Sequence, residues 1–275
     1  MESKVHSAPI SVVIPCYRAT AFLERAVDSV LAQTLRPSEL ILIDDASPDD
    51  GKTRDLIINL ANKINNKNIG VLASPILLDK NKGPGGARNA GWENAHESWI
   101  AFLDADDAWH PNKLAMQYQY ILANRDVDIC AHHYLLIDGS GLNPQAIDGR
   151  EQEVPRAQKV RIADMLISNR VPTRSVMLKR GIPLRFPEHA LSEDYFLWLR
   201  LIASGYQLHL LNCSLAYTFK PEYSEGGLSG RLWLQEKGEL NALKNLHSEG
   251  GINGLVYLLA CGWSLMKFLR RSIMR

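Results

Sequence analysis

Several features that would place this chain in a specialised class are scarce or missing. Its 275 residues include only 4 cysteines, which lie far apart and form no CxxC pair. We therefore expect reduced thiols in a cytoplasmic protein, not a disulfide framework or a zinc site. Residues 1–10, MESKVHSAPI, lack the continuous apolar segment of a secretory signal. With 46% hydrophobic residues, 22% charged residues, 19 glycines and 13 prolines, the composition excludes collagen and low-complexity disorder.

A surplus of charge of one sign is also missing. The chain has 31 Lys and Arg against 30 Asp and Glu, for a net charge of +1, which speaks against a dedicated nucleic-acid-binding protein. The charges are unevenly distributed along the chain, however. Residues 1–110 carry 15 acidic and 11 basic side chains, whereas residues 111–275 carry 15 acidic and 20 basic side chains. After Glu249 every charged side chain is basic. The two ends of the chain are therefore expected to meet different partners.

Apolar runs and helical patterns alternate along the first half of the chain. The apolar runs that predict strands are residues 10–14, 40–43, 69–72 and 99–103. Helical patterns separate them at about residues 22–31, 52–65 and from 85 onward. This alternation predicts βαβ units around a mainly parallel sheet. Later in the chain we expect a strand at 127–137, a polar loop at 138–158, and a helix capped by Ser192 that ends at Gly205.

Carboxylates follow two of the predicted strands directly. Asp44-Asp45 ends one apolar run, and Asp104-Ala105-Asp106-Asp107 ends another. In an open parallel sheet, ligands bind in the crevice outside the carboxyl ends of the strands. Several carboxylates there repel one another unless a cation joins them, and a divalent ion completed by substrate phosphates fits this arrangement. The alternative is a pair of solvated turns, because Asp is common in turns.

The stretch Asn81-Lys82-Gly83-Pro84-Gly85-Gly86-Ala87-Arg88-Asn89 is similar to a phosphate-binding loop. It does not match a dinucleotide fingerprint, because Arg88 stands where the third glycine belongs, and no Walker Lys-Ser/Thr pair follows. A helix that begins here could still present its N-terminus to an anion, with Arg88 or Lys82 neutralising a diphosphate. A plain turn before a helix explains the stretch equally well.

Six short motifs follow one another between residues 11 and 200. They are SVVIPCYR at 11–18, AVDSVLAQT at 26–34, LILIDDASPDD at 40–50, NKGPGGARNAG at 81–91, WIAFLDADDAWHP at 99–111 and SEDYFLWLR at 192–200. Each motif is weak alone, but the ordered set resembles the family 2 glycosyltransferases. The resemblance implies the GT-A fold, an α/β class with a Rossmann-like, mainly parallel central sheet and flanking helices, here extended by C-terminal helices.

The resemblance also implies a division of the chain. Residues 1–220 would form the catalytic domain, with the part that binds the nucleotide sugar at 1–110 and the acceptor side at 111–220. Residues 221–275 would form a flap and a helical tail. The Gly- and Ser-rich segment 220–229 is the expected flap near the diphosphate.

The resemblance assigns roles to particular residues. Pro15 and Tyr17 would form the wall of the nucleotide pocket, Asp45 would accept a hydrogen bond from the base, and Arg88 would lie near the nucleotide. Arg18 departs from the family pattern, in which many members carry Asn after the Tyr, and this leaves the details of the base pocket open.

Four acidic residues would carry the chemistry. Asp104 and Asp106 would be the D-x-D pair that touches the ribose and a Mn²⁺ or Mg²⁺ ion, with Asp107 beside them. Asp194, in the pair Glu193-Asp194, would be the catalytic base. Without the resemblance, Glu193-Asp194 is better explained as the acidic first turn of a helix, which the helix dipole favours.

The implied reaction moves a sugar from a nucleotide sugar, most commonly a UDP-sugar in this family, to a hydroxyl of a glycan or lipid-linked glycan acceptor in polysaccharide biosynthesis. Asp194 would remove the hydroxyl proton while the oxygen attacks the anomeric carbon from the opposite face, which inverts its configuration. A nucleotidyltransferase is one alternative, but it would need a basic glycine-rich loop where Pro-Cys-Tyr-Arg follows the first strand. A non-catalytic carbohydrate-binding protein is the other, and the joint presence of Asp45, Asp104, Asp106 and Asp194 disfavours it.

The C-terminal segment is apolar and basic. Its apolar part, residues 252–266, is shorter than the roughly 20 residues that span a bilayer. The segment 252–275 places Trp263 and Phe268 beside Lys267, Arg270 and Arg271, which is typical of a helix lying on an anionic membrane surface. The protein would then be peripheral on the inner face of the cytoplasmic membrane. A helix docked on the catalytic domain or in a homodimer interface is the alternative.

Overall fold

The computed structural model describes residues 7–137, 155–219 and 232–273. In these residues a nine-stranded sheet runs in the order β3-β2-β1-β4-β8-β6-β9-β5, with β7 paired to β9. The strands are β1 (Ala8–Cys16), β2 (Pro37–Asp44), β3 (Leu72–Leu77), β4 (Trp99–Phe102), β5 (Ala108–Trp109), β6 (Ile129–Leu136), β7 (Ala157–Lys159), β8 (Met177–Lys179) and β9 (Leu208–Thr218). The helices are α1 (Leu23–Leu31), α2 (Lys52–Asn66), α3 (Gly83–Glu93), α4 (Lys113–Ala123), α5 (Ile162–Ile167), α6 (Glu193–Ala203), α7 (Leu232–Ser248) and α8 (Gly254–Ile273).

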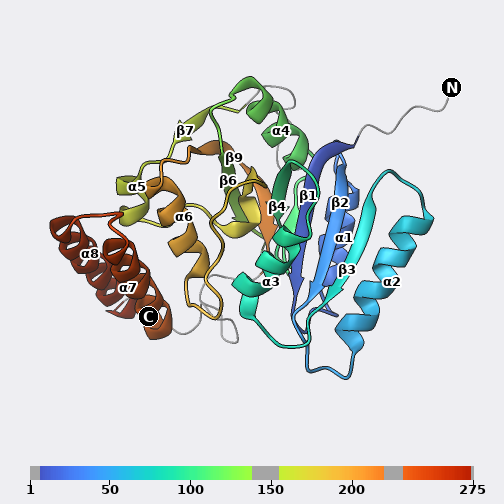
Figure 1. Ribbon diagram of the computed structural model, residues 1–275, viewed down its shortest axis with the longest axis horizontal. Coiled ribbons are helices and arrows are strands. Elements are labelled where there is room, and N and C mark those ends of the chain that lie inside the picture. The colour runs from blue at the N-terminus through green and yellow to red at the C-terminus, as the bar shows by residue number, and fades with distance from the viewer. Residues whose placement is uncertain (1–6, 138–154, 220–231, 274–275) are drawn as a thin grey trace.

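Strands β1 to β4 form the parallel half of the sheet, as the sequence predicted. Val12 of β1 pairs in parallel register with Leu40 of β2 and with Ala101 of β4. Both faces of these strands are buried, which is why their sequences are continuously apolar. On one face the core includes side chains of α1, α2 and α4, and on the other it includes side chains of α3, α6 and α7 (Figure 1).

The other half of the sheet is mixed. Strand β8 enters antiparallel between β4 and β6, and β9 pairs in parallel with β6 while β5 and β7 join it antiparallel. The parallel part of the fold prediction is therefore confirmed for the N-terminal half. The short antiparallel insertion of β8 explains why the regular alternation of strands and helices is lost after about residue 160.

Two local predictions were wrong, and a third was confirmed only in part. The strand expected at residues 69–72 lies at Leu72–Leu77, because Gly70, with a φ of 79°, belongs to the preceding turn. Residues 157–159, expected in a loop, form β7 against β9; the rest of that loop from 138 to 154 lies outside the described residues, as does the expected flap from 220 to 229. Ser192 occupies the N-cap position of α6 as predicted, but its backbone is left-handed at φ 55° and its hydroxyl makes no capping hydrogen bond.

Helices α7 and α8 lie side by side at one end of the molecule (Figure 1). Helix α7 packs on α6, and α8 touches α5, where the indole Nε1 of Trp263 donates to the backbone oxygen of Ile167 at 2.9 Å. Across the described residues, no helix is long and apolar enough to cross a membrane.

Candidate active site

Most of the expected site residues lie at or directly after the carboxyl ends of β1, β2 and β4, which are at one edge of the sheet (Figure 1). Arg88, from α3, is the centre of the acidic group at this edge. Its guanidinium donates to Asp104 Oδ1 at 2.6 Å and to Glu193 Oε1 at 2.8 Å. One buried cation thus joins α3, the turn after β4 and the first turn of α6.

Close packing of α3 explains its run of glycines. A Cβ at Gly85 would lie 2.8 Å from the backbone oxygen of Pro187 and 3.0 Å from Cγ of Glu193. A side chain there would push α3 away from the segment that leads into α6. The Asn89 side chain holds the same segment, since it donates to the Phe186 carbonyl at 2.8 Å and accepts the Phe186 amide at 3.0 Å. The glycine stretch therefore brings Arg88 within reach of Glu193.

Two arginines set the charge state of Asp104. Burial on its own would raise the pKa of this carboxyl, but Arg88 and Arg174 outweigh that effect and hold the pKa of Asp104 below its ordinary value. Arg174 comes from the 3-10 turn at Thr173–Ser175 and lies over the Tyr134 ring, 4.8 Å from its centre. Asp104 is therefore an ionised carboxylate with fixed cationic partners.

Asp107 lies in the same turn but in a different environment. It is buried and accepts from the Arg174 guanidinium at 3.0 Å. Burial nevertheless raises its pKa to about 7, and the neighbouring charges of Asp104 and Asp106 add to this effect. The backbone oxygen of Asp106 accepts from Arg25 at 2.6 Å, so the acidic turn is also tied to α1.

The carboxylates of this turn suit a hard divalent cation in their chemistry, because oxygen ligands are those that Mg²⁺ and Mn²⁺ prefer. The described residues contain no ready-made group of three or more His, Cys, Asp or Glu side chains around one point. Asp104 and Asp107 are each engaged by an arginine. A cation here would therefore take part of its coordination from a substrate, as Mg²⁺ does with phosphates.

The nucleotide-side residues lie at the ends of β1 and β2. Asp45 is buried and accepts the backbone N–H of Lys82 at 2.7 Å, and its carbonyl accepts from the Asn81 amide at 3.1 Å. Burial raises the pKa of Asp45 above its ordinary value. These two hydrogen bonds hold the loop before α3 against the end of β2. Because Arg88 lies on α3, they also fix the position of Arg88 relative to Asp45. Tyr17, two residues after the half-buried Pro15, is 49% exposed. This exposure is what we expect of a residue that lines an open pocket.

Asp194 lies in the first turn of α6. Its Oδ1 accepts the backbone N–H of Tyr195 at 2.7 Å, and its Oδ2 accepts from the Thr173 hydroxyl at 3.3 Å. Burial and the neighbouring charge of Glu193 raise the pKa of Asp194 to about 6, although Arg88 acts in the opposite direction. A carboxylate that is held in place and has a pKa close to neutrality suits a general base.

The structure thus brings Arg88, Asp104, Asp107 and Asp194 into one charged group. Sequence reasoning missed the roles of two residues in it. Glu193 was noticed only as the neighbour of Asp194, and Arg174 lies in no motif. No local signal could have found Arg174, because its partner Asp107 lies 67 residues away in the sequence.

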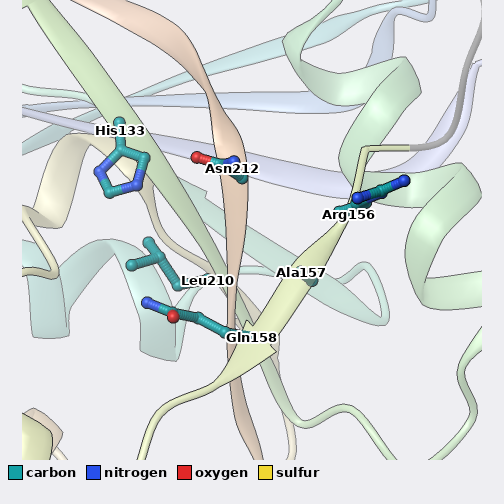
Figure 2. A pocket seen from close by; sticks show the side chains of 6 residues that line it. All are labelled: His133, Arg156, Ala157, Gln158, Leu210 and Asn212. Carbon is teal, nitrogen blue, oxygen red and sulfur yellow. The ribbon is translucent and has the colours of Figure 1, made fainter.

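Two aromatic residues of α6 that follow Asp194 belong to the core. Tyr195 and Trp198 are buried, whereas Trp233 is exposed at the start of α7. A cavity of about 260 Å³ lies elsewhere, between β6, β7 and β9 (Figure 2). Its lining consists of His133, Arg156, Ala157, Gln158, Leu210 and Asn212. None of the predicted site residues is among them, so this cavity is separate from the charged group around Arg88.

The sequence model of Glycosyl transferase family 2 matches residues 11–182. The chain belongs to this family. It is therefore a glycosyltransferase, and its sheet is that of the GT-A fold. The match runs from β1 past β8 and covers the turn of Asp104 and Asp106, whereas α6 with Asp194 lies beyond it.

Individual relatives support this assignment. An uncharacterized glycosyltransferase of Nostoc sp. is 39% identical over 147 residues, which are 54% of this chain and 42% of the relative. The Escherichia coli protein WfgD, named UDP-Glc:alpha-D-GlcNAc-diphosphoundecaprenol beta-1,3-glucosyltransferase, is 27% identical over 252 residues, covering 91% of this chain and 90% of its own. Among solved structures, S. aureus TarS 1-349 in complex with UDP-GlcNAc has a TM-score of 0.64 at 18% identity, over 86% of this chain and 66% of the other. That likeness shows the shared fold.

Proposed function

We propose that this family 2 glycosyltransferase transfers a sugar from a UDP-sugar to a hydroxyl of a lipid-linked glycan, with inversion at the anomeric carbon and with the help of Mn²⁺ or Mg²⁺. The name of WfgD, which matches 91% of this chain, specifies a UDP-sugar donor and a diphosphoundecaprenol-linked acceptor. We assign the catalytic domain to residues 1–220, with donor binding at 1–110 and acceptor binding at 111–220, and the flap and helical tail to 221–275.

One observation carries this proposal. Arg88 joins Asp104, on the donor side, to Glu193, the residue directly before Asp194. A donor-binding carboxylate and a candidate base are thereby held within one ion-paired group. Such preorganisation is what an in-line displacement needs, because the acceptor oxygen and the anomeric carbon must meet in a fixed orientation.

The donor would be held at the ends of β1, β2 and β4. Tyr17 and Pro15 would flank the base of the nucleotide, and Asp45 would accept a hydrogen bond from it. Asp104 would contact the ribose, while Arg88 would lie near the nucleotide. The nucleotidyltransferase alternative receives no support from this arrangement, since β1 leads into an exposed Tyr17 without a basic glycine-rich loop.

The metal would be held chiefly by Asp106. Binding a cation to Asp104 or Asp107 would oppose their existing ion pairs with Arg88 and Arg174, so these two would act as adjacent ligands only after local adjustment. When bound, Mn²⁺ or Mg²⁺ would neutralise the negative charge that develops on the departing diphosphate.

Asp194 would act as the base. Its raised pKa of about 6 leaves it ionised at neutral pH yet able to bind a proton. Thr173 and the Tyr195 amide orient its carboxylate. It would take the proton from the acceptor hydroxyl as that oxygen attacks the anomeric carbon from the side opposite the leaving diphosphate.

Substitution of Asp194 tests this assignment. Asp194→Asn keeps the size of the side chain but removes the base, so we expect sugar transfer to fall by at least about a hundredfold while UDP binding is unchanged. Transfer is measured with radiolabelled UDP-glucose and a diphospholipid-linked acceptor, and binding by calorimetry. Asp55→Asn is the matched control, because Asp55 also lies in the first turn of a helix but is exposed on α2. Full transfer by Asp194→Asn would remove Asp194 from this role.

A further inference from the structure

Helix α8 carries its apolar side chains on the outside. Its exposed large apolar residues recur at spacings of three and four, so they line one face of the helix. We call them the outer face of α8: Leu255, Leu258, Leu259, Leu265, Met266, Leu269 and Ile273. On a helical projection this face contains no charged side chain, and Gly262 is the only other residue within it.

The inner face of α8 is mixed: Ala260 is buried in the core and Val256 packs against it, while polar and charged side chains on the same side contact α7. Arg271 pairs with Glu236 of α7 at 3.2 Å, and Lys267 approaches Glu239 of α7 at 3.8 Å. The Ser264 hydroxyl donates to Glu239 at 3.2 Å and is itself buried. Because these contacts of the inner face, polar and apolar, hold α8 on the protein, the exposed leucines of the outer face are left to contact something else. A continuous exposed apolar patch of this kind marks an interaction site.

The surroundings of the outer face indicate its partner. Arg270 is exposed at the edge of this face, and no acidic residue follows Glu249 in the sequence. Trp233, which is 60% exposed, packs against Phe268 with ring centres 5.6 Å apart. Leucines bordered by basic and aromatic side chains match a helix that lies in the interface of an anionic bilayer.

We propose that the outer face of α8 inserts into the headgroup region of an anionic membrane, with the helix parallel to the surface. The proposal deepens the proposed function and rests on it for the identity of the acceptor, since a lipid-linked acceptor is presented at a membrane. The C-terminal end of α8 points to the same end of the molecule as the carboxyl ends of β1 and β2 (Figure 1).

A second copy of the chain is a weaker candidate for the same face. A two-fold dimer through α8 would bring together two copies of the same face, each with the exposed Arg270 at its edge. Anionic headgroups complement this charge, whereas a second copy repeats it. We therefore assign the face to lipid.

The test is sedimentation of the full chain with vesicles in the absence of substrate. We expect binding to vesicles of phosphatidylcholine with phosphatidylglycerol and much weaker binding to phosphatidylcholine alone. Leu258→Gln/Leu269→Gln should weaken binding to the anionic vesicles by about tenfold or more. Leu72→Gln/Leu122→Gln is the matched control, since these exposed leucines lie on β3 and α4, and it should bind like the wild type. Arg270→Gln should lower binding to anionic vesicles only.

Three outcomes would overturn the proposal. One is a wild-type chain that does not sediment with anionic vesicles, and another is equal binding by both double variants. The third is a wild-type dimer, measured by light scattering, that Leu258→Gln/Leu269→Gln converts to a monomer without any change in vesicle binding. Sugar transfer to a soluble acceptor analogue is measured separately, because it tests the proposed function without requiring the membrane face. Vesicle binding without sugar transfer would refute the proposed function alone, whereas transfer without vesicle binding would refute the membrane face alone.

Discussion

Arg88 and Asp194 show how much of this site depends on single side chains. Arg88 is buried, and its ion pairs with Asp104 and Glu193 raise its pKa further above its already high value despite burial. Asp194 is held less firmly in its charged form, because burial and the neighbouring charge of Glu193 raise its pKa to about 6. One residue is thus locked in its charged form, while the other can gain and lose a proton near neutral pH.

The raised pKa of Asp194 predicts how activity depends on pH. A base must be ionised to accept a proton, so kcat/KM for sugar transfer should fall about tenfold per pH unit as the pH decreases below about 6. The measurement is a pH profile with a fixed acceptor, controlled by UDP binding at each pH. A profile that stays flat down to pH 4 would contradict the assignment of Asp194 as the base.

The same shift predicts a gain of stability in Asp194→Asn. The folded protein binds the Asp194 proton more tightly than the unfolded chain does, so ionising this buried carboxyl lowers the free energy of unfolding. The loss builds up between the ordinary pKa of about 4 and the folded value of about 6, and is complete above it. Urea unfolding should therefore show Asp194→Asn more stable than wild type by about 1 kcal/mol at pH 8, with no difference at pH 4.

The control for this comparison is Asp55→Asn, which removes an exposed acid from the first turn of α2. It should give no gain at pH 8, because an acidic side chain near a helix N-terminus is favourable. A pH-independent difference for Asp194→Asn would show that repacking, not ionisation, is responsible.

At the scale of elements, α3 matters because it packs unusually closely. Gly85 allows contact with the segment before α6, and Gly91 allows contact with β1, where a Cβ would lie 2.4 Å from the Val13 side chain. The helix therefore carries Arg88 at a depth where it reaches both Asp104 and Glu193. In the structure, the glycine stretch that is similar to a phosphate loop allows α3 to pack closely on its neighbours.

This packing predicts a clear effect of Gly85→Ala. The added methyl group would meet the Pro187 carbonyl at 2.8 Å, so we expect a loss of about 1–3 kcal/mol in the free energy of unfolding, as overpacking typically causes. Gly262→Ala in α8 is the matched control, since nothing lies within 4 Å of its Cβ. It should raise stability by about 0.5–1 kcal/mol through the higher helix propensity of alanine. Chemical unfolding of both variants measures the difference, and equal effects would contradict the close packing of α3.

At the scale of the whole molecule, the sheet joins a parallel half to a mixed half. Strand β8 links them, because it pairs antiparallel with both β4 and β6. The charged group spans the same boundary, since Asp104 and Asp107 follow β4 whereas Arg174 precedes β8 and Glu193 begins α6. A ligand bound at this boundary should therefore stabilise the whole fold.

We expect UDP with Mn²⁺ to raise the melting temperature by about 5 °C or more at saturating concentration. GDP and CDP with Mn²⁺, and UDP with a chelator, should give smaller shifts. Thermal shift measurements on the wild type and on Asp106→Asn test this, since loss of the metal ligand should remove the Mn²⁺-dependent part only. If no nucleoside diphosphate stabilises the protein with either metal, the proposed donor and cofactor are both wrong.

The sequence by itself determined the features that depend on neighbouring residues. Apolar runs predicted β1, β2 and β4, because strands buried on both faces need continuous apolar sequence. The acids after β2 and β4 indicated a ligand site at the strand ends, and the order of six motifs indicated the family. These signals are local, so a single chain is enough to read them.

Only the tertiary structure decided which distant residues meet. Arg88 and Glu193 are separated by 105 residues, and Arg174 and Asp107 by 67. No pattern in the sequence specifies such pairs, because they follow from the antiparallel entry of β8 and the close packing of α3. A second example is which face of α8 points away from the protein. The apolar residues of this helix predicted a buried or membrane-bound face equally well. The ion pairs of Lys267 and Arg271 to α7, together with the exposure of the leucines, show that the leucines face outward.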